Sequence, residues 1–309
     1  TNLNYKRIYL IELTGVLMSK KMNKTQNPLS AYFRAPKLFT KIPSGGKFYE
    51  EGIIEFNDDT SFELAIYPMT TKDELLLKNP DALLNGEAVA SLIQSCVPEV
   101  KNARNLYSAD VDALLIAIRG ASGGDDVEVS GTCPKCETTT DVTVSVAQSL
   151  LNMEEVKDLY QITLANGLVI SGMPFSYKNT IKAGVASFQS TRSMQSISSL
   201  TDDMERLKAF NESFVKLADL NFELLIDAIY SVVYQDEEGE DVSIDDKVII
   251  REFLENTDNT VGKEIEAFIN SINAKGVNTE VQIECGNEEC EETYVSTINF
   301  DPVNFFTGS

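Results

Sequence analysis

The chain of 309 residues contains no histidine. This excludes a Ser-His-Asp triad, a Cys-His pair and an HExxH metalloprotease motif, because each of them needs an imidazole. A Walker A phosphate loop is also missing, since the Gly-rich stretch PSGGKF at residues 43–48 lacks its spacing and indicates a turn. The 48 acidic residues are so widely spread that no carboxylate pair stands out as an acid and base. We therefore predict that the protein is not an enzyme and has no catalytic residues.

Positive charge is scarce. The formal net charge is -22 and the pI is about 4.4. This charge argues against binding nucleic acid, which depends on neutralising phosphates with Lys and Arg. The exception is a basic N-terminal arm, residues 1–47, with nine basic residues and one acid, so that the arm carries +8 and the remainder -30. The arm is either a solvated tail or a segment that packs against acidic surface, and we expect residues 1–40 to contact another chain, copies of this one included.

Long hydrophobic runs are absent as well. The apolar stretch from Ile8 to Leu17 is interrupted by Glu12 and is not followed by a small-residue cleavage site. It is also far shorter than the roughly 20 apolar residues of a membrane-spanning helix. We predict a strand or short helix there, and a soluble intracellular protein with no membrane partner.

Hydrophobic periodicity predicts elements in the order β, α, β, α, β, with the helices grouped. Residues 61–69 alternate as in a half-buried strand, and Thr71 with Glu74 has the spacing of a helix-capping box. Asn166-Gly167 lies between two strand-like runs and is a strong hairpin signal. Grouped helices of this kind favour an α+β fold over a doubly wound sheet.

The middle of the chain has helical periodicity. We predict helices over residues 176–190 and over the long stretch from Asp202 to Val233, and two further helices before the last β segment. The candidate core residues of the long helix share helical spacing: Phe210, Phe214, Leu217, Phe222, Leu225 and Ile226.

Four of the five cysteines form two pairs, each in a tight turn between strand-like runs. Cys133 and Cys136 belong to the motif CPKC, and Cys285 and Cys290 belong to CGNEEC. Zinc is usually held tetrahedrally, and four thiolates from two such turns form a closed structural site. A soft, oxygen-poor ligand set excludes Mg²⁺ and Ca²⁺ as the resident ion. We therefore predict that these four cysteines hold one structural Zn²⁺.

Three alternatives stay open for these cysteines. Two disulfides would be unusual in an acidic intracellular protein. A redox CxxC would lie at a strand-to-helix junction, whereas here a strand follows. Four buried free thiols are the third alternative. The fifth cysteine, Cys96, lies on the apolar face of a predicted helix and is expected to be a core residue.

The surroundings of the two turns are acidic, with Lys135 as the lone base. A zinc ribbon that binds nucleic acid would carry the opposite charge. We therefore expect this four-cysteine module to be structural or to contact protein.

Together these patterns predict an α+β fold: mixed β-sheet and helices with a discontinuous four-cysteine zinc-ribbon-like module and an inserted helical block. We divide the chain into a basic N-terminal arm (1–47), an α+β core (48–127), β-hairpins with the first cysteine knuckle (128–173), a helical insertion (174–275), and a second cysteine-knuckle hairpin with a C-terminal tail (276–309).

Several short motifs follow one another between residues 40 and 146. They are Pro43-Ser44-Gly45-Gly46-Lys47-Phe48-Tyr49, Met69-Thr70 with Asp73-Glu74, Asn85-Gly86 before a helix, Asp110 with Leu114-Leu115, Arg119 before a Gly-rich break, and the CPKC hairpin directly after it. In order and spacing this stretch resembles the T-even-type bacteriophage baseplate hub protein family, whose members are contractile-tail baseplate proteins.

The resemblance implies a virion or assembly protein that is made in the host cytoplasm and located in the phage tail baseplate. Its partners would be other baseplate or tail proteins, and it implies no active site. We predict a structural component of the baseplate. Two alternatives remain: a baseplate hub assembly chaperone that is not retained in quantity in the virion, and a zinc-ribbon adaptor with a nucleic-acid role.

Overall fold

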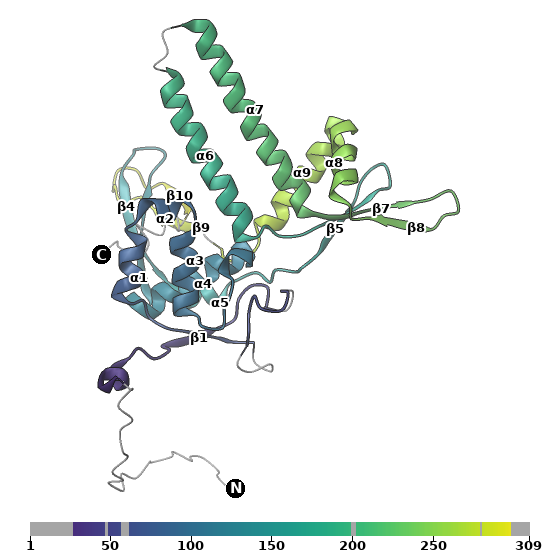
Figure 1. The fold of residues 1–309 in the computed structure, drawn as a ribbon. Helices are drawn as coiled ribbons and strands as arrows, with labels where there is room; N and C mark the ends of the chain where they lie inside the picture. Colours follow the sequence, from purple (N-terminus) through teal and green to yellow (C-terminus); the bar gives the residue numbers. More distant parts are fainter. Residues whose placement is uncertain (1–26, 47–48, 57–61, 199–201, 279, 298–309) are drawn as a thin grey trace, which may run out of the picture. The chain divides into compact units, whose positions relative to one another are not determined.

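The computed structural model describes residues 27–46, 49–56, 62–198, 202–278 and 280–297 (Figure 1). The chain divides into two compact units, Thr1–Arg34 and Ala35–Ser309. In the first unit, the 3-10 helix η1 (Pro28–Tyr32) begins with a proline. Its N-cap is Asn27, whose side chain accepts a hydrogen bond from the Leu29 N–H over 3.0 Å. The stretch Ile8–Leu17 lies outside the described residues, whereas residues 35–46 of the predicted arm belong to the second unit.

The second unit contains a helical core built around one buried helix. Its elements are β1 (Leu38–Thr40), β2 (Leu64–Ile66), α1 (Thr71–Leu77), α2 (Pro80–Leu84), α3 (Glu87–Cys96), η2 (Ala103–Asn105) and α4 (Ser108–Gly123). Helix α4 is buried at every position from Ala113 to Ile118, as expected of a helix that is apolar all round. Cys96 is fully buried in the same core, as predicted.

Two predicted details of this core were wrong. All three residues of β2 are buried, because the strand pairs with β1 and packs into the helical core, so it is not half-buried. The capping box of α1 uses Thr70 and Asp73, one residue earlier than the predicted pair Thr71 and Glu74. The Thr70 backbone N–H donates to Asp73 (2.8 Å), and the Asp73 N–H donates back to the Thr70 hydroxyl (3.3 Å).

Two antiparallel hairpins carry the cysteine turns. The first consists of β3 (Asp126–Thr132) and β4 (Thr139–Ser145) and is followed by α5 (Val146–Leu151). The second consists of β9 (Glu280–Glu284) and β10 (Thr293–Thr297). In β3 exposed and buried residues alternate, as a sheet with one solvated face requires.

A four-stranded antiparallel sheet has the order β5 (Tyr160–Thr163), β6 (Val169–Gly172), β7 (Ile229–Gln235), β8 (Asp241–Ile244). The predicted hairpin at Asn166-Gly167 joins β5 to β6, and Gly167 has the positive φ of 87° that such turns need. The two later helices form as predicted, as α8 (Lys247–Asn256) and α9 (Asn259–Asn273), and they form a common apolar core with this sheet.

Helices α6 (Tyr177–Ser198) and α7 (Asp203–Ala228) form a long hairpin inserted between β6 and β7 (Figure 1). The predicted helix to Val233 was too long, because the β-branched and aromatic run IYSVVY pairs with β6 and β8 as strand β7. Among its predicted core residues Ile226 is buried, but Phe210 and Phe214 are 44% and 61% exposed. Mixed helices and small antiparallel sheets make the fold α+β, as predicted.

Candidate metal centre

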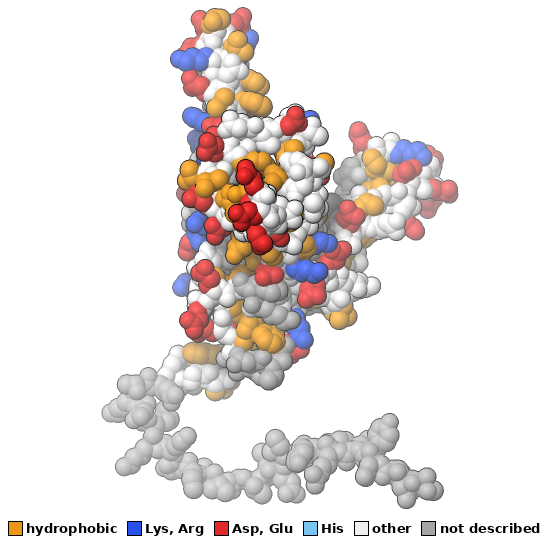
Figure 2. All heavy atoms as spheres, turned by 90° about the vertical axis from the view of Figure 1, so that its right-hand side faces the viewer, with side chains coloured by type: hydrophobic (Ala, Val, Ile, Leu, Met, Phe, Trp, Pro, Cys, Tyr) orange, Lys and Arg blue, Asp and Glu red, His pale blue; other side chains and the backbone are white. Residues whose placement is uncertain are grey.

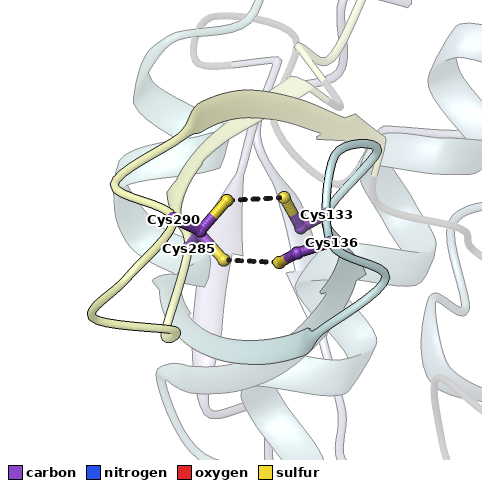
Figure 3. A group of neighbouring side chains, drawn as sticks. All are labelled: Cys133, Cys136, Cys285 and Cys290. Carbon is purple, nitrogen blue, oxygen red and sulfur yellow. Dashed lines mark hydrogen bonds between the residues drawn. The ribbon is translucent and has the colours of Figure 1, made fainter.

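The four cysteines predicted from the sequence come together between the two hairpins (Figure 3). The Sγ atoms of Cys133 and Cys290 are 3.8 Å apart and those of Cys136 and Cys285 are 3.5 Å apart, and all four lie within 4.8 Å of one another. A tetrahedral zinc with Zn–S bonds of about 2.3 Å separates its sulfurs by about 3.8 Å. These distances therefore fit one tetrahedral ion, and they are much longer than the about 2.05 Å of a disulfide.

Both cysteine turns share two backbone features: a hydrogen bond from the N–H of the first cysteine across the turn, and a left-handed residue after the second cysteine. In the first turn the Cys133 N–H donates to the Thr138 carbonyl, and the Glu137 N–H donates back to the Cys133 carbonyl, each over 2.9 Å. In the second turn the Cys285 N–H donates to the Glu292 carbonyl over 2.9 Å. In each turn the residue after the second cysteine is left-handed, with φ values of 59° at Glu137 and 47° at Glu291. A non-glycine residue with such a φ is uncommon and persists only where the surrounding structure holds it.

The thiols differ in their acidity. Hydrogen bonds from the Thr138 side chain and backbone lower the pKa of Cys136 to about 6, and the Thr138 hydroxyl lies 3.3 Å from its sulfur. In contrast, burial raises the pKa of Cys290 to about 12. Four thiolates at this spacing repel one another unless a cation neutralises them, and a coordinating metal deprotonates its thiols. The donor set thus matches a soft divalent cation such as zinc.

Protein contacts also hold the two hairpins together. The buried Tyr294 hydroxyl donates to the Gly131 carbonyl over 2.8 Å, and the Gly286 N–H donates to the Thr140 hydroxyl over 2.8 Å. A side chain at Gly131 would overlap Ile283, so glycine permits the close approach of β3 to the second hairpin. The apolar centre is small, comprising fully buried Cys133 and Ile283 with nearly buried Tyr294. A core of this size favours a module that is completed by a metal.

A second buried polar site joins three of the motif residues. The N–H and the hydroxyl of Ser44 donate to the Asp110 carboxylate over 2.9 and 2.5 Å, and the Tyr49 hydroxyl donates to the same group. The Tyr49 oxygen in turn accepts from the Tyr107 N–H over 2.8 Å. Asp110 is fully buried, and this burial raises the pKa of its carboxyl group. We call Ser44, Tyr49 and Asp110 the Asp110 network.

The glycines of the same motif make the turn that the sequence predicts. Gly45 and Gly46 have φ values of 64° and 69°, which disfavour a side chain. The Gly46 N–H donates to the Ser44 hydroxyl over 3.0 Å, so the turn orients the serine toward Asp110. Sequence reasoning did not connect these residues, because Asp110 alone looks like an ordinary acid in the first turn of a helix. In the sequence, the only signal that linked these residues was the order of the family motifs in which they occur.

The fold and the site define an α+β protein with a discontinuous, zinc-ribbon-like four-cysteine module. The family model described as T4 bacteriophage base plate protein matches residues 35–307, so the chain belongs to this family. The match confirms the resemblance and extends it over the helical hairpin and the second cysteine turn. No curated protein and no solved structure matches the chain. Within the part of the chain that the structure describes, no helix has the length and apolarity to cross a bilayer.

Proposed function

We propose that this protein is a structural component of the baseplate of a contractile-tailed phage and acts through protein–protein contacts rather than catalysis. Its membership of the base plate family over residues 35–307 carries this proposal. The motif residues support it, because the Asp110 network and the cysteine turns tie distant segments of the chain together. On this proposal the protein is made in the host cytoplasm and resides in the tail of the virion, with other baseplate or tail proteins as its partners and neither nucleic acid nor membrane.

Mass spectrometry of purified particles tests this role. We expect the protein at a fixed copy number comparable to those of other baseplate proteins. Its absence from complete particles would instead favour a hub assembly chaperone. A filter-binding assay over a range of salt concentrations addresses the nucleic-acid adaptor, and salt-sensitive binding would contradict our proposal.

We further propose that Cys133, Cys136, Cys285 and Cys290 hold one structural Zn²⁺. The inter-sulfur distances of 3.5 and 3.8 Å and the all-thiolate ligand set support this. Metal analysis of protein purified without chelator should give about one zinc per chain. Cys133→Ser should lose the zinc and much of the module's stability, since structural zinc binding contributes on the order of 10 kcal/mol in small peptides. Cys96→Ser is the control outside the site and should keep the metal.

The basic arm is the third part of the proposal. We propose that residues 1–40 contact a neighbouring chain, and the exposure of Leu29, Tyr32 and Phe33 (61%, 85% and 64%) supports an apolar contact in addition to charge. Deletion of residues 1–34, the first compact unit, should impair incorporation into particles while the second unit stays folded. Unchanged incorporation would contradict this part of the proposal.

A further inference from the structure

Helix α7 exposes a row of large apolar side chains. Met204, Leu207, Phe210, Phe214 and Val215 are 76%, 56%, 44%, 61% and 54% exposed, and we call these five residues the apolar stripe. The first four are spaced by three or four residues, which places them on one side of the helix, and Val215 lies beside Phe214 at the edge of that side. Figure 2 shows hydrophobic side chains at the surface of the upper part of the α6–α7 hairpin.

The hairpin is closed by small residues together with the larger Ile197 of α6 and Leu217 and Leu220 of α7, which are buried or half-buried. On α7 the half-buried positions include Ala209 and Ser213, and on α6 they include Ala183, Ala186 and Ser190. These positions also repeat every three or four residues and form the side of each helix that faces the other. An amphipathic helix usually buries its apolar residues, and the inner side of α7 already has apolar residues that close the hairpin, so the apolar stripe is a second apolar side that the hairpin on its own leaves exposed. Contiguous exposed apolar surface of this kind marks an interaction site.

The apolar stripe ends before the part of α7 that a residue of α8, Arg251, covers. Phe222 lies about two turns beyond the stripe, and the Arg251 guanidinium lies 5.9 Å from the centre of its ring. Arg251 also pairs with Glu223. The free part of α7 is therefore its first four turns, and the base of the helix is occupied by α8.

The hairpin is a part of the chain where two copies can approach with little charge repulsion. Residues 177–228 contain six basic and seven acidic residues, a net charge of -1, which leaves -21 for the rest of the chain. Two copies repel each other through the acidic remainder but hardly through the hairpin.

The charges beside the stripe are self-complementary. Lys208, Glu212, Lys216 and Asp219 follow one edge of it with alternating sign. If a second α7 lies antiparallel and is centred near Phe214, Lys208 of one copy faces Asp219 of the other, and Glu212 faces Lys216. A two-fold dimer needs a surface that matches itself in this way.

We infer that the apolar stripe binds a second copy of this chain, with the two α7 helices antiparallel and the two hairpins forming a four-helix bundle. The two Phe214 rings meet at the two-fold axis, and the Lys208–Asp219 pairs flank them. This contact goes beyond the proposed function and does not involve the N-terminal arm.

Sedimentation equilibrium of the full-length chain at about 0.15 M salt, where exposed charge pairs are already partly screened, tests the inference. We expect a monomer–dimer equilibrium. The double variant Phe210→Ser and Phe214→Ser should weaken the dimer about a hundredfold, since buried aromatic anchors dominate interfaces. Both side chains are exposed in the single chain, so the fold should be retained. The matched control is Val248→Ser, which removes a 72% exposed apolar residue of α8 and should leave dimerisation unchanged.

A charge exchange tests the antiparallel register. Lys208→Glu or Asp219→Lys alone should weaken the dimer, and the two together should restore it. A chain that stays monomeric up to about 100 µM, a range in which weak specific complexes still form, would overturn the inference, as would a dimer unaffected by the phenylalanine changes. Stripe-dependent binding to a different baseplate protein without self-association would also overturn it. Because these assays use the isolated chain, their failure leaves the baseplate role untouched.

Discussion

The Asp110 network offers a sharp test of what the family motifs do. The perturbation is a pair of substitutions, Asp110→Asn and Asp110→Ala. Three donors converge on the carboxylate: the N–H and hydroxyl of Ser44 and the hydroxyl of Tyr49. The alanine variant removes the acceptor for all three, whereas asparagine keeps one oxygen, which can still accept from the Ser44 N–H.

The magnitudes follow from the number of donors left without an acceptor. A buried donor left unpaired costs about 1–3 kcal/mol. The hydroxyls of Ser44 and Tyr49 keep the bonds that they accept from Gly46 and Tyr107, so part of their loss is recovered. We expect the free energy of unfolding to fall by roughly 2–5 kcal/mol in Asp110→Ala and by roughly 1–3 kcal/mol in Asp110→Asn.

The pH dependence has a defined sign. Burial raises the pKa of Asp110 in the folded protein above its ordinary value. A group of this kind contributes stability that is fully present below its unfolded pKa, about 3.9, and that is lost as pH rises through the folded pKa. Asparagine does not titrate, so the stability difference between the native protein and Asp110→Asn should be larger near pH 4.5 than at pH 7.

Urea denaturation followed by far-UV circular dichroism measures these differences, since the chain has no tryptophan. Asp241→Asn, an exposed acid of β8, is the control and should change the free energy of unfolding by no more than about 0.5 kcal/mol. A native-minus-asparagine difference that grows as pH rises would refute the reasoning, because it would mean that the three donors outweigh burial. So would an alanine variant as stable as the native protein.

The remaining predictions concern single contacts. Tyr294→Phe removes the buried hydrogen bond to the Gly131 carbonyl, so the free energy of unfolding should fall by about 1 kcal/mol while the proposed zinc stays bound. Gly86→Ala places a side chain at a φ of 72° and against Ile181, and calorimetry should show that the free energy of unfolding falls by roughly 1–3 kcal/mol. Adding Ile181→Ala should restore only part of this stability, because the backbone strain at residue 86 remains. Lys135→Ala breaks an exposed ion pair with Glu292, so urea denaturation and metal analysis should show little change in either stability or metal content; a large effect would mean that this pair supports the cysteine turns.

The cysteine module was accessible from the sequence because its signals are local. Each turn lies between strand-like runs, and the chemistry of four thiolates indicates that the pairs belong together whatever their separation. The structure brings these four sulfurs within 4.8 Å of one another. The left-handed residues Glu137 and Glu291 could not be predicted, because nothing in a glutamate signals a positive φ.

The wrong predictions concern residues whose structure depends on tertiary contacts. The run that forms β7 continues the periodicity of α7, and only its pairing with β6 and β8 makes it a strand. For Phe210 and Phe214 the helical spacing was right, but the inference that an apolar face lies inside its own chain was wrong. Asp110 was missed for a related reason, since its three donors belong to Ser44 and Tyr49, which lie 66 and 61 residues earlier in the sequence.

The two cysteine turns lie about 150 residues apart in the sequence, and the two ends of the inserted segment explain how they still come together. The Glu154 N–H donates to the Gly276 carbonyl over 2.8 Å, and the Lys275 ammonium lies 3.3 Å from the Glu154 carboxylate. The chain thus leaves and returns at one point, and the sheet β5–β8 with its helices has its own apolar core between these residues. Loop-closure entropy grows only slowly with length, and an insertion that folds by itself removes most of it. Folding of the inserted segment therefore places the second hairpin beside the first. The four cysteines then need to bring together only segments that already lie close to each other.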